Sequence, residues 1–398
     1  MGQTYFRKGF GLKREIADSL AVDYHSRLVD RIRSSGNTLA VGDLTIKLAK
    51  EFGFCYGVDR AVEYAYETES KFPDKRVFLV GEIIHNPHVN VKLESMGITI
   101  LRPDPDGQFD YAAVTSDDVV IIPAFGVTLR DFQHLRELGC ILVDTTCGSV
   151  LNVWKRVEQY ARDGFTAMVH GKYFHEETKA TASQVEKFPN GRYLIVRDMD
   201  EAELVCRFIE DGGDATALEA HFRDKVSKNF VFESDLVRIG IANQTTMLAS
   251  ESLAIAARVA ESMRRRYGEA VLGEHFRSFD TICSATQERQ DAVLELIDEQ
   301  LDIMIVIGGY NSSNTNHLAK ICAAKRTTYH IADASCIDPD AGTISYKPVG
   351  SDEEIMKADW LGGSVQTVGI SAGASTPNNK IGEAIERIVQ MRGVSLAD

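Results

Sequence analysis

From Glu51 onward, short apolar runs alternate with longer segments in which apolar residues recur every three or four positions. Runs such as VVII and IMIVI are typical of buried strands, and the longer segments are typical of amphipathic helices. This alternation predicts an α/β fold with mostly parallel sheets. Residues 1–50 are mixed and charged, with helical periodicity between Lys13 and Arg33, and we interpret them as an N-terminal extension packed on the main body.

Three parts of the α/β region repeat one order of features. A cysteine comes first, and a helical segment, an apolar strand and a glycine follow it. The pairs are Cys55 with Gly81, Cys147 with Gly171, and Cys283 with Gly308. Their separations of 26, 24 and 25 residues are similar enough to indicate three related units.

The repeat predicts three related α/β domains around a pseudo-threefold axis. Each domain continues to a second strand that ends in a loop of polar or small residues. The predicted ranges are 51–146, 147–282 and 283–381, with the extension at 1–50 and a C-terminal helix and tail at 382–398.

Polar side chains lie just past the predicted strand ends. Because ligands of parallel sheets bind beyond the carboxyl ends of the strands, we expect these side chains to converge. They are His85, His175, Gln244, Thr245, Ser312 and Ser375. The polar run from Asn311 through Asn314 precedes a helical stretch, and hydroxyl, amide and free N–H groups there favour phosphate binding. The alternative for that run is a plain helix N-cap.

Cys55, Cys147 and Cys283 would meet near the axis of such an arrangement. Three thiolates repel one another unless a metal centre neutralises them, and thiolates select zinc, copper or iron–sulfur clusters. A 4Fe–4S cluster with three cysteine ligands leaves one iron open, which can act as a Lewis acid toward a substrate oxygen. The alternative is that all three are small core residues. A core role is what we predict for Cys140, Cys206, Cys322 and Cys336.

Glu177 follows His175 by two residues. A carboxyl group beside an anionic, poorly solvated site is expected to have a raised pKa and to deliver a proton. The competing interpretation is an exposed, solvated glutamate, which is what we expect of its neighbour Glu176.

Charge and hydropathy restrict the partners. The chain has 44 Lys and Arg against 58 Asp and Glu, a net charge of −14 with histidine neutral, which argues against nucleic-acid or anionic-membrane binding. No apolar run approaches the roughly 20 residues of a membrane helix. The N-terminal segment lacks the apolar stretch of a signal peptide, so we expect a cytoplasmic protein.

A series of motifs occurs in the order found in one known family. The motifs are FCYGVDRA, EIIHNPHV, DTTC, HGKYFHEET, NQTTM, DTICSATQERQ, NSSNTNHLA and SAGASTP. From about Glu51 to about Ile381, the chain resembles the 4-hydroxy-3-methylbut-2-enyl diphosphate reductase family, also called LytB or IspH. The long N-terminal segment, with RKGFG near its start, is similar to the longer subgroup that includes plastid enzymes and their bacterial relatives.

The resemblance implies three α/β domains around one central 4Fe–4S cluster. It also implies the last step of the non-mevalonate (MEP) isoprenoid pathway, the reductive dehydroxylation of 4-hydroxy-3-methylbut-2-enyl diphosphate. Two electrons and two protons enter, and isopentenyl and dimethylallyl diphosphate form with loss of water. The implied partners are the small allylic diphosphate and an electron donor protein, a ferredoxin or a flavodoxin.

By position, the resemblance implies Cys55, Cys147 and Cys283 as ligands of a cluster with one open iron. Glu177 matches the proton donor, and Thr245, preceded by Gln244 in the substrate-binding set, matches the residue that orients the substrate hydroxyl. The implied diphosphate-binding residues are His85, His175, Ser312, Ser313, Asn314 and Ser375.

One position departs from the common family pattern, because Phe125 stands where many members have histidine. Phenylalanine donates no hydrogen bond, so one diphosphate contact is unassigned, and Lys172 or His170 is a hypothetical substitute. Two other classes stay open at this point. A hydro-lyase with an open-iron cluster would consume no reductant, and a non-catalytic phospho-ligand binding protein would hold no iron.

Overall fold

The structure, a computed structural model, describes residues 4–279, 281–394 and 396, and these form two compact units. The first unit holds the residues up to Arg7, Asp74–Gly81 and Thr99–Cys283. The second holds Lys8–Pro73, Glu82–Ile98 and the residues from Ser284 onward. Both units are built on mostly parallel sheets with helices, which confirms the predicted α/β class. The predicted domain ranges stay a prediction.

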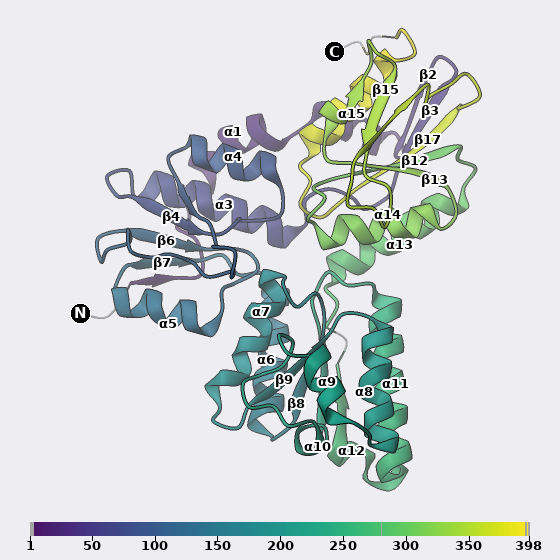
Figure 1. Cartoon of the computed structure of the whole chain (residues 1–398). Helices are drawn as coiled ribbons and strands as arrows, with labels where there is room; N and C mark the ends of the chain where they lie inside the picture. Colours follow the sequence, from purple (N-terminus) through teal and green to yellow (C-terminus); the bar gives the residue numbers. More distant parts are fainter. Residues whose placement is uncertain (1–3, 280, 395, 397–398) are drawn as a thin grey trace. The chain divides into compact units, whose positions relative to one another are not determined.

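One sheet of the first unit has the strand order β1-β7-β6-β4-β5, and all its neighbouring strands are parallel (Figure 1). Its strands are β1 (Tyr5–Phe6), β4 (Val77–Val80), β5 (Thr99–Leu101), β6 (Val119–Ile122) and β7 (Ile141–Asp144). The helix α5 (Leu129–Leu138) packs on it through the fully buried Leu135. The helix ends at Gly139, whose left-handed conformation (φ 73°) suits a residue without a side chain.

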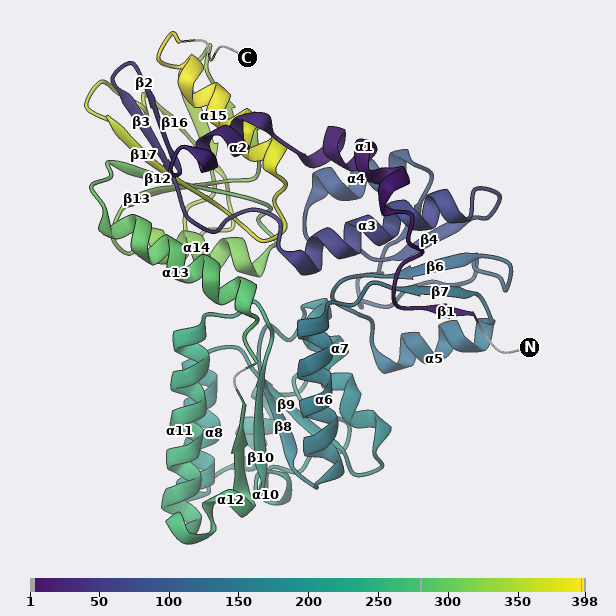
Figure 2. The ribbon, with the colours of Figure 1, turned by 180° about the vertical axis from the view of Figure 1, so that it is seen from behind.

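The other sheet of the first unit has the parallel order β11-β10-β8-β9. Its strands are β8 (Thr166–His170), β9 (Arg192–Val196), β10 (Ile239–Asn243) and β11 (Phe276–Ser278). Helices α8 (Met199–Asp211) and α11 (Ala249–Tyr267) lie side by side on one face, and α6 (Gly148–Arg162) covers the other (Figure 2). Alternation along β8 explains the two faces, because Met168 packs with the first pair and Ala167 with α6.

Shorter helices complete the first unit. They are α7 (Glu176–Ser183), the 3-10 turn Gln184–Lys187, α9 (Ala215–His221), α10 (Phe232–Asp235), the 3-10 turn Glu269–Val271 and α12 (Leu272–His275). Of these, α7 carries the predicted proton donor in its first turn.

The main sheet of the second unit has the order β13-β12-β17-β3-β2. Its strands are β2 (Thr38–Val41), β3 (Leu44–Leu48), β12 (Ile303–Ile307), β13 (Thr327–Ile331) and β17 (Thr367–Ala372). All pairs are parallel except β2 with β3. Helices α2 (Arg27–Ser34) and α15 (Asn378–Gln390) pack on one face, and α13 (Ser284–Asp298) and α14 (Ser313–Ala323) pack on the other (Figure 2).

The remaining elements of the second unit are three helices, a 3-10 turn and a small antiparallel sheet. They are α1 (Lys13–Tyr24), α3 (Tyr56–Lys71), α4 (Pro87–Ser95), the 3-10 turn Ala334–Cys336, β14 (Ile337–Asp338), β15 (Thr343–Tyr346) and β16 (Ile355–Ala358). Within the described part of the chain, none of the helices is both long and apolar enough to cross a membrane.

The first 50 residues, predicted as an extension packed on the main body, also contribute strands to the sheets. β1 pairs with β7 of the first unit, and β3 pairs with β17 of the second. The predicted helical stretch is present as α1 and α2, which are separated where Ser26 accepts a hydrogen bond from the Val29 N–H and so starts the second helix. The strands were not predicted, because short, partly charged segments such as LTIKL give a weak periodic signal.

The predicted order within each repeat is confirmed. Each repeat cysteine is followed by a helix and then a buried strand, which are α3 and β4, α6 and β8, and α13 and β12. The second strands of the repeats are β6, β10 and β17. The loops that follow these three strands are important for the site, because each accepts a backbone hydrogen bond from one of the repeat cysteines.

Candidate active site

One backbone hydrogen bond recurs at all three repeat cysteines. The N–H of Cys147 donates to the Ala124 carbonyl (2.9 Å), that of Cys283 to Thr245 (3.3 Å) and that of Cys55 to Ala374 (3.2 Å). Each acceptor lies two residues after the end of a second strand, β6, β10 or β17. The three cysteines are therefore structurally equivalent, as the sequence repeat predicts.

Each repeat cysteine also lies at the start of a helix. Cys55 is the N-cap of α3, Cys147 is the N-cap of α6, and Cys283 immediately precedes α13. The positive end of a helix dipole stabilises negative charge, and a thiolate is the form that binds metal. All three residues are partly exposed and outside any disulfide. Their setting fits soft metal ligands.

The other cysteines have a different environment. Burial raises the pKa of Cys140 to about 11 and that of Cys322 to about 12, and it also raises the pKa of Cys206. These thiols stay protonated near neutral pH and pack in the cores, as predicted. Cys336 is only partly buried, against the core of the second unit.

In the first unit, hydrogen bonds connect Cys283, Thr245, Glu177 and His175. Beyond the Cys283–Thr245 contact, the Thr245 N–H donates to Glu177 Oε1 at 2.6 Å. The Glu177 N–H in turn donates to Nδ1 of His175 at 3.2 Å. Because Nδ1 accepts, the proton of the neutral imidazole lies on Nε2. Glu177 is 1% exposed, so the interpretation of an exposed, solvated glutamate is wrong.

Gln244 joins the loops after β8 and β10. Its Oε1 accepts from the Lys172 N–H and the Thr178 hydroxyl, both at 3.1 Å, and its Nε2 donates to Thr246 at 2.9 Å. Gln244 is fully buried, and the site of Gly171 leaves no room beside it, since an added Cβ would lie 2.7 Å from the Thr178 hydroxyl. Gln244 thus orders the loop that presents Thr245. Its role in substrate binding stays a prediction.

Phe125 packs against the predicted diphosphate residue His175. The two rings are 5.6 Å apart and nearly perpendicular (82°). Of the two hypothetical substitutes for the missing histidine, His170 is fully buried and its Nδ1 contacts Ser252 at 2.8 Å. Burial lowers its pKa to about 4, so His170 is neutral and does not supply positive charge. Lys172 remains the hypothesis.

In the second unit, the start of α14 carries Ser312, Ser313 and Asn314. The Ser312 hydroxyl accepts from the Thr315 N–H (3.3 Å) and caps the helix, so the N-cap alternative describes a real part of its role. Asn314 Oδ1 accepts from the Ala374 N–H at 2.9 Å, which fixes the orientation of the amide. Its Nδ2 is buried and has no hydrogen-bond partner among the described residues. A buried, unsatisfied donor at a helix start favours an anionic ligand.

His85 and Ser375 lie together in the same unit. The Ser375 hydroxyl donates to the His85 carbonyl at 3.1 Å, and Asn86 Nδ2 donates to the Ser375 carbonyl at 2.7 Å. The Glu82 carboxylate accepts from His85 Nδ1 at 2.8 Å and orients the ring. His85 and Ser375 are buried, at 7% exposure each.

Two further residues near the predicted site residues were not predicted. Arg289 of α13 is buried and donates to the carbonyls of Gly53 (2.8 and 3.2 Å) and Phe54 (3.1 Å), so it positions the loop before Cys55. Asn243 ends β10, and its buried Oδ1 has no partner among the described residues. No spacing rule marks either residue in the sequence, since the contacts of Arg289 and the burial of Asn243 both depend on the fold.

Parallel sheets, a buried glutamate, donors at a helix start and three equivalent cysteines are features of an α/β enzyme that acts on a small anionic substrate. The comparison with known proteins agrees: the chain belongs to the LytB family, described as "LytB protein", which it matches over residues 46–389.

Two curated relatives are both named 4-hydroxy-3-methylbut-2-enyl diphosphate reductase. The protein of Gloeobacter violaceus is 47% identical over 396 residues, which cover 98% of this chain and 94% of the relative. That of Thermosynechococcus vestitus is 46% identical and covers 99% of this chain and 96% of the relative.

Solved structures give the same result. One, "Structure of (E)-4-Hydroxy-3-methyl-but-2-enyl Diphosphate Reductase, the Terminal Enzyme of the Non-Mevalonate Pathway", is 28% identical with a TM-score of 0.53 and covers 87% of this chain and 99% of its own. A diphosphate reductase from Plasmodium falciparum is 19% identical with a TM-score of 0.61, covers 85% of this chain and 86% of its own, and supports the fold alone.

Proposed function

We propose that this chain catalyses the reductive dehydroxylation of 4-hydroxy-3-methylbut-2-enyl diphosphate to isopentenyl and dimethylallyl diphosphate, the last step of the non-mevalonate pathway. Its support is membership of the LytB family together with 47% identity to a reductase over nearly the whole chain. The structural observation that carries it is the hydrogen-bonded series Cys283, Thr245 and Glu177, which holds a buried carboxyl group beside a candidate metal ligand.

The proposed cofactor is one 4Fe–4S cluster held by Cys55, Cys147 and Cys283, with one open iron. The donor set fits this group, because three equivalent, partly exposed thiols at helix starts are the soft ligands that iron–sulfur clusters take. When bound, the cluster supplies electrons and a Lewis-acidic iron.

The chain's own residues bind and orient the substrate. The open Nδ2 of Asn314 and the hydroxyl groups of Ser312, Ser313 and Ser375 are proposed to bind the diphosphate, with His85 and His175 donating from their rings. Thr245 is buried at 4% exposure, its backbone is held by the bond to Glu177, and its hydroxyl is proposed to orient the substrate hydroxyl.

Glu177 is proposed to move the proton. Its carboxyl group is fixed at Oε1 by the Thr245 N–H, so its position does not depend on solvent. Protonation of the departing hydroxyl by this group releases water rather than hydroxide. Over the full reaction, the C–O bond breaks and a C–H bond forms, with two electrons and two protons consumed.

The electron donor is proposed to be a ferredoxin or a flavodoxin, since a reductase needs a source of reducing equivalents. The cytoplasmic location stays a prediction.

Anaerobic purification followed by iron and sulfide counts and a turnover assay tests the proposal. We expect close to four of each per chain, and two electrons from reduced methyl viologen for each allylic diphosphate consumed. Turnover without consumption of reductant would instead establish a hydro-lyase. Colourless protein after anaerobic cluster reconstitution would contradict the cluster and favour the phospho-ligand binding protein.

A further inference from the structure

The first unit also has a groove with charged side chains along its walls. The groove has a volume of about 710 Å³ and is bordered by β1, the loop and helix around α5, and α6. Four cationic and two anionic side chains line it: Arg7, Arg136, Lys155 and Lys187, with Asp144 and Glu158. An excess of positive charge is unusual in a chain whose net charge is −14.

The excess charge is carried by two of these residues. Arg7 pairs with Asp144 (3.4 Å) and Lys187 with Glu158 (2.6 Å), so these four charges balance. Arg136 and Lys155 are exposed and form no ion pair with any described residue. The groove therefore presents two uncompensated cations beside the apolar rings of Phe132 and Trp154.

The residues that line the groove include Thr146, which directly precedes the proposed cluster ligand Cys147 in the chain. Asp144 Oδ1 accepts from the N–H (2.9 Å) and the hydroxyl (2.5 Å) of Thr146, the residue before Cys147. Asp144 also accepts a hydrogen bond from Tyr5 of β1. Two lining residues, Asp144 and Thr146, thus belong to the β7 end that carries Cys147.

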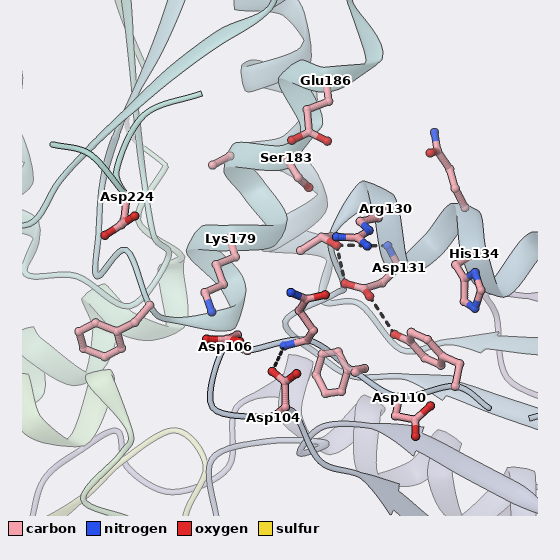
Figure 3. A pocket seen from close by; sticks show the side chains of 18 of the residues that line it. Asp104, Asp106, Asp110, Arg130, Asp131, His134, Lys179, Ser183, Glu186 and Asp224 are labelled. Carbon is pink, nitrogen blue, oxygen red and sulfur yellow. Dashed lines mark hydrogen bonds between the residues drawn. The ribbon is translucent and has the colours of Figure 1, made fainter. Parts of the chain in front are cut away.

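The other large groove of the same unit has the opposite charge. It has a volume of about 1330 Å³. Figure 3 shows acidic side chains from the 104–110 loop on one side, and Lys179 and Ser183 of α7 with Glu186 of the following 3-10 turn on another. Only two cationic side chains line it, Arg130 and Lys179. The carboxylates that line it number seven: Asp104, Asp106, Asp110, Asp131, Glu137, Glu186 and Asp224. An acidic protein would be repelled there and attracted by the basic groove.

We propose that the basic groove is the docking site of the protein electron donor, and that this donor is a small ferredoxin with an acidic face. The inference rests on the proposed function, since only a reductase needs a donor. Weak electron-transfer complexes use small interfaces and rely on charge complementarity for fast encounter, which two uncompensated cations beside aromatic rings can provide. Each reduced ferredoxin gives up one electron and leaves oxidised, so two docking events supply the two electrons of one turnover.

The test compares the double charge reversal Arg136→Glu/Lys155→Glu with a matched control, Arg223→Glu/Lys228→Glu. The control residues are also one arginine and one lysine, exposed in the same unit but outside the groove. With a reduced acidic [2Fe–2S] ferredoxin at low salt, we expect kcat/KM for the ferredoxin to fall about ten- to hundredfold in the groove variant. The control should change less than twofold, and salt should narrow the difference.

Two further measurements separate the docking proposal from the proposed function. With reduced methyl viologen as donor, the groove variant should turn over like the wild type. An equal loss with this small donor would mean that the groove maintains the catalytic structure, which overturns docking. Calorimetric titration with oxidised ferredoxin needs no turnover: unchanged affinity in the groove variant would overturn docking alone, whereas a wild type inactive with methyl viologen would defeat the proposed function.

Discussion

The two units use hydrogen bonds differently at the predicted site residues. In the first unit, the site residues hydrogen-bond to neighbouring protein groups. Glu177 accepts from the Thr245 N–H, and the Gln244 side-chain amide makes three hydrogen bonds. In the second unit, Asn314 uses its oxygen for Ala374 and keeps a buried nitrogen without a partner among the described residues.

This difference teaches how each unit contributes to the proposed reaction. A proton donor must be held in one geometry, and internal hydrogen bonds achieve that. An anion site must keep donors available for its ligand, and an unsatisfied donor at a helix start achieves that. A variant of Glu177 in the first unit should therefore change kcat, and a variant of Asn314 in the second should change KM.

The largest effects are expected for the repeat cysteines, which occur in both units. Cys147→Ser in the first unit and Cys55→Ser in the second should each lower iron content and reduce turnover with methyl viologen by more than about 100-fold, because a serine hydroxyl is a poor iron ligand. Cys206→Ser, in a buried core position, should keep both iron and activity. A normal iron content in either variant would contradict the proposal that the three cysteines are equivalent ligands of the cluster.

Glu177→Gln is the next largest test, and it addresses the first unit. Glutamine can still accept from the Thr245 N–H, but it cannot protonate the departing oxygen. We expect kcat to fall about 10²- to 10³-fold with KM within about twofold and with unchanged iron content. Steady-state kinetics with methyl viologen measure both constants. Near-normal kcat would end the assignment of Glu177 as proton donor.

Asn314→Asp addresses the second unit with a smaller effect. The aspartate keeps an acceptor for the Ala374 N–H but replaces the open donor with a negative charge facing the proposed diphosphate. Since a hydrogen bond to a charged group contributes about 1.5–3 kcal/mol, KM should rise at least roughly tenfold. Lys320→Ala, an exposed residue on the same helix, serves as the control. An effect on kcat alone would contradict the division of roles.

The smallest effect is expected for the loss of folding stability at acidic pH, which should be similar in the two units. Burial lowers the pKa of His170 in the first unit and of His330 in the second to about 4 each, against about 6.5 in an unfolded chain. Between these values the unfolded state binds more protons, so stability is present above pH 6.5 and is lost as pH falls toward 4.

Between pH 7 and 5.5, each histidine should cost on the order of 1 kcal/mol of unfolding free energy. His330 Nε2 donates to the Gly308 carbonyl at 2.9 Å, and the amide of His330→Gln can keep a donor there without titrating. Urea unfolding at the two pH values should show a smaller acid loss in this variant. An equal loss would mean that other groups cause it.

The sequence predicted the α/β class and the helix–strand order of the repeats because these depend on local periodicity and on matched cysteine positions. It located Glu177 two residues after His175, but the Thr245 contact that holds its carboxyl group joins residues 68 positions apart. Arg289 escaped prediction for the same reason, since its partners Gly53 and Phe54 are distant in sequence, and so did the pairing of β3 with β17. Local sequence patterns therefore predict helices and strands, whereas the roles of individual residues depend on contacts formed in the folded chain.

The chain has two tryptophans, and each unit contains one. Trp154 lines the basic groove and lies under Gly126, where an added Cβ would approach its ring to 2.4 Å. Trp360 is 2% exposed and contacts Tyr329 edge-on in the core of the second unit. Replacing either one by phenylalanine leaves a protein whose indole fluorescence comes from a single unit. The molecule thus carries built-in optical probes, one that would respond to a bound donor protein and one that would follow the folding of the second unit.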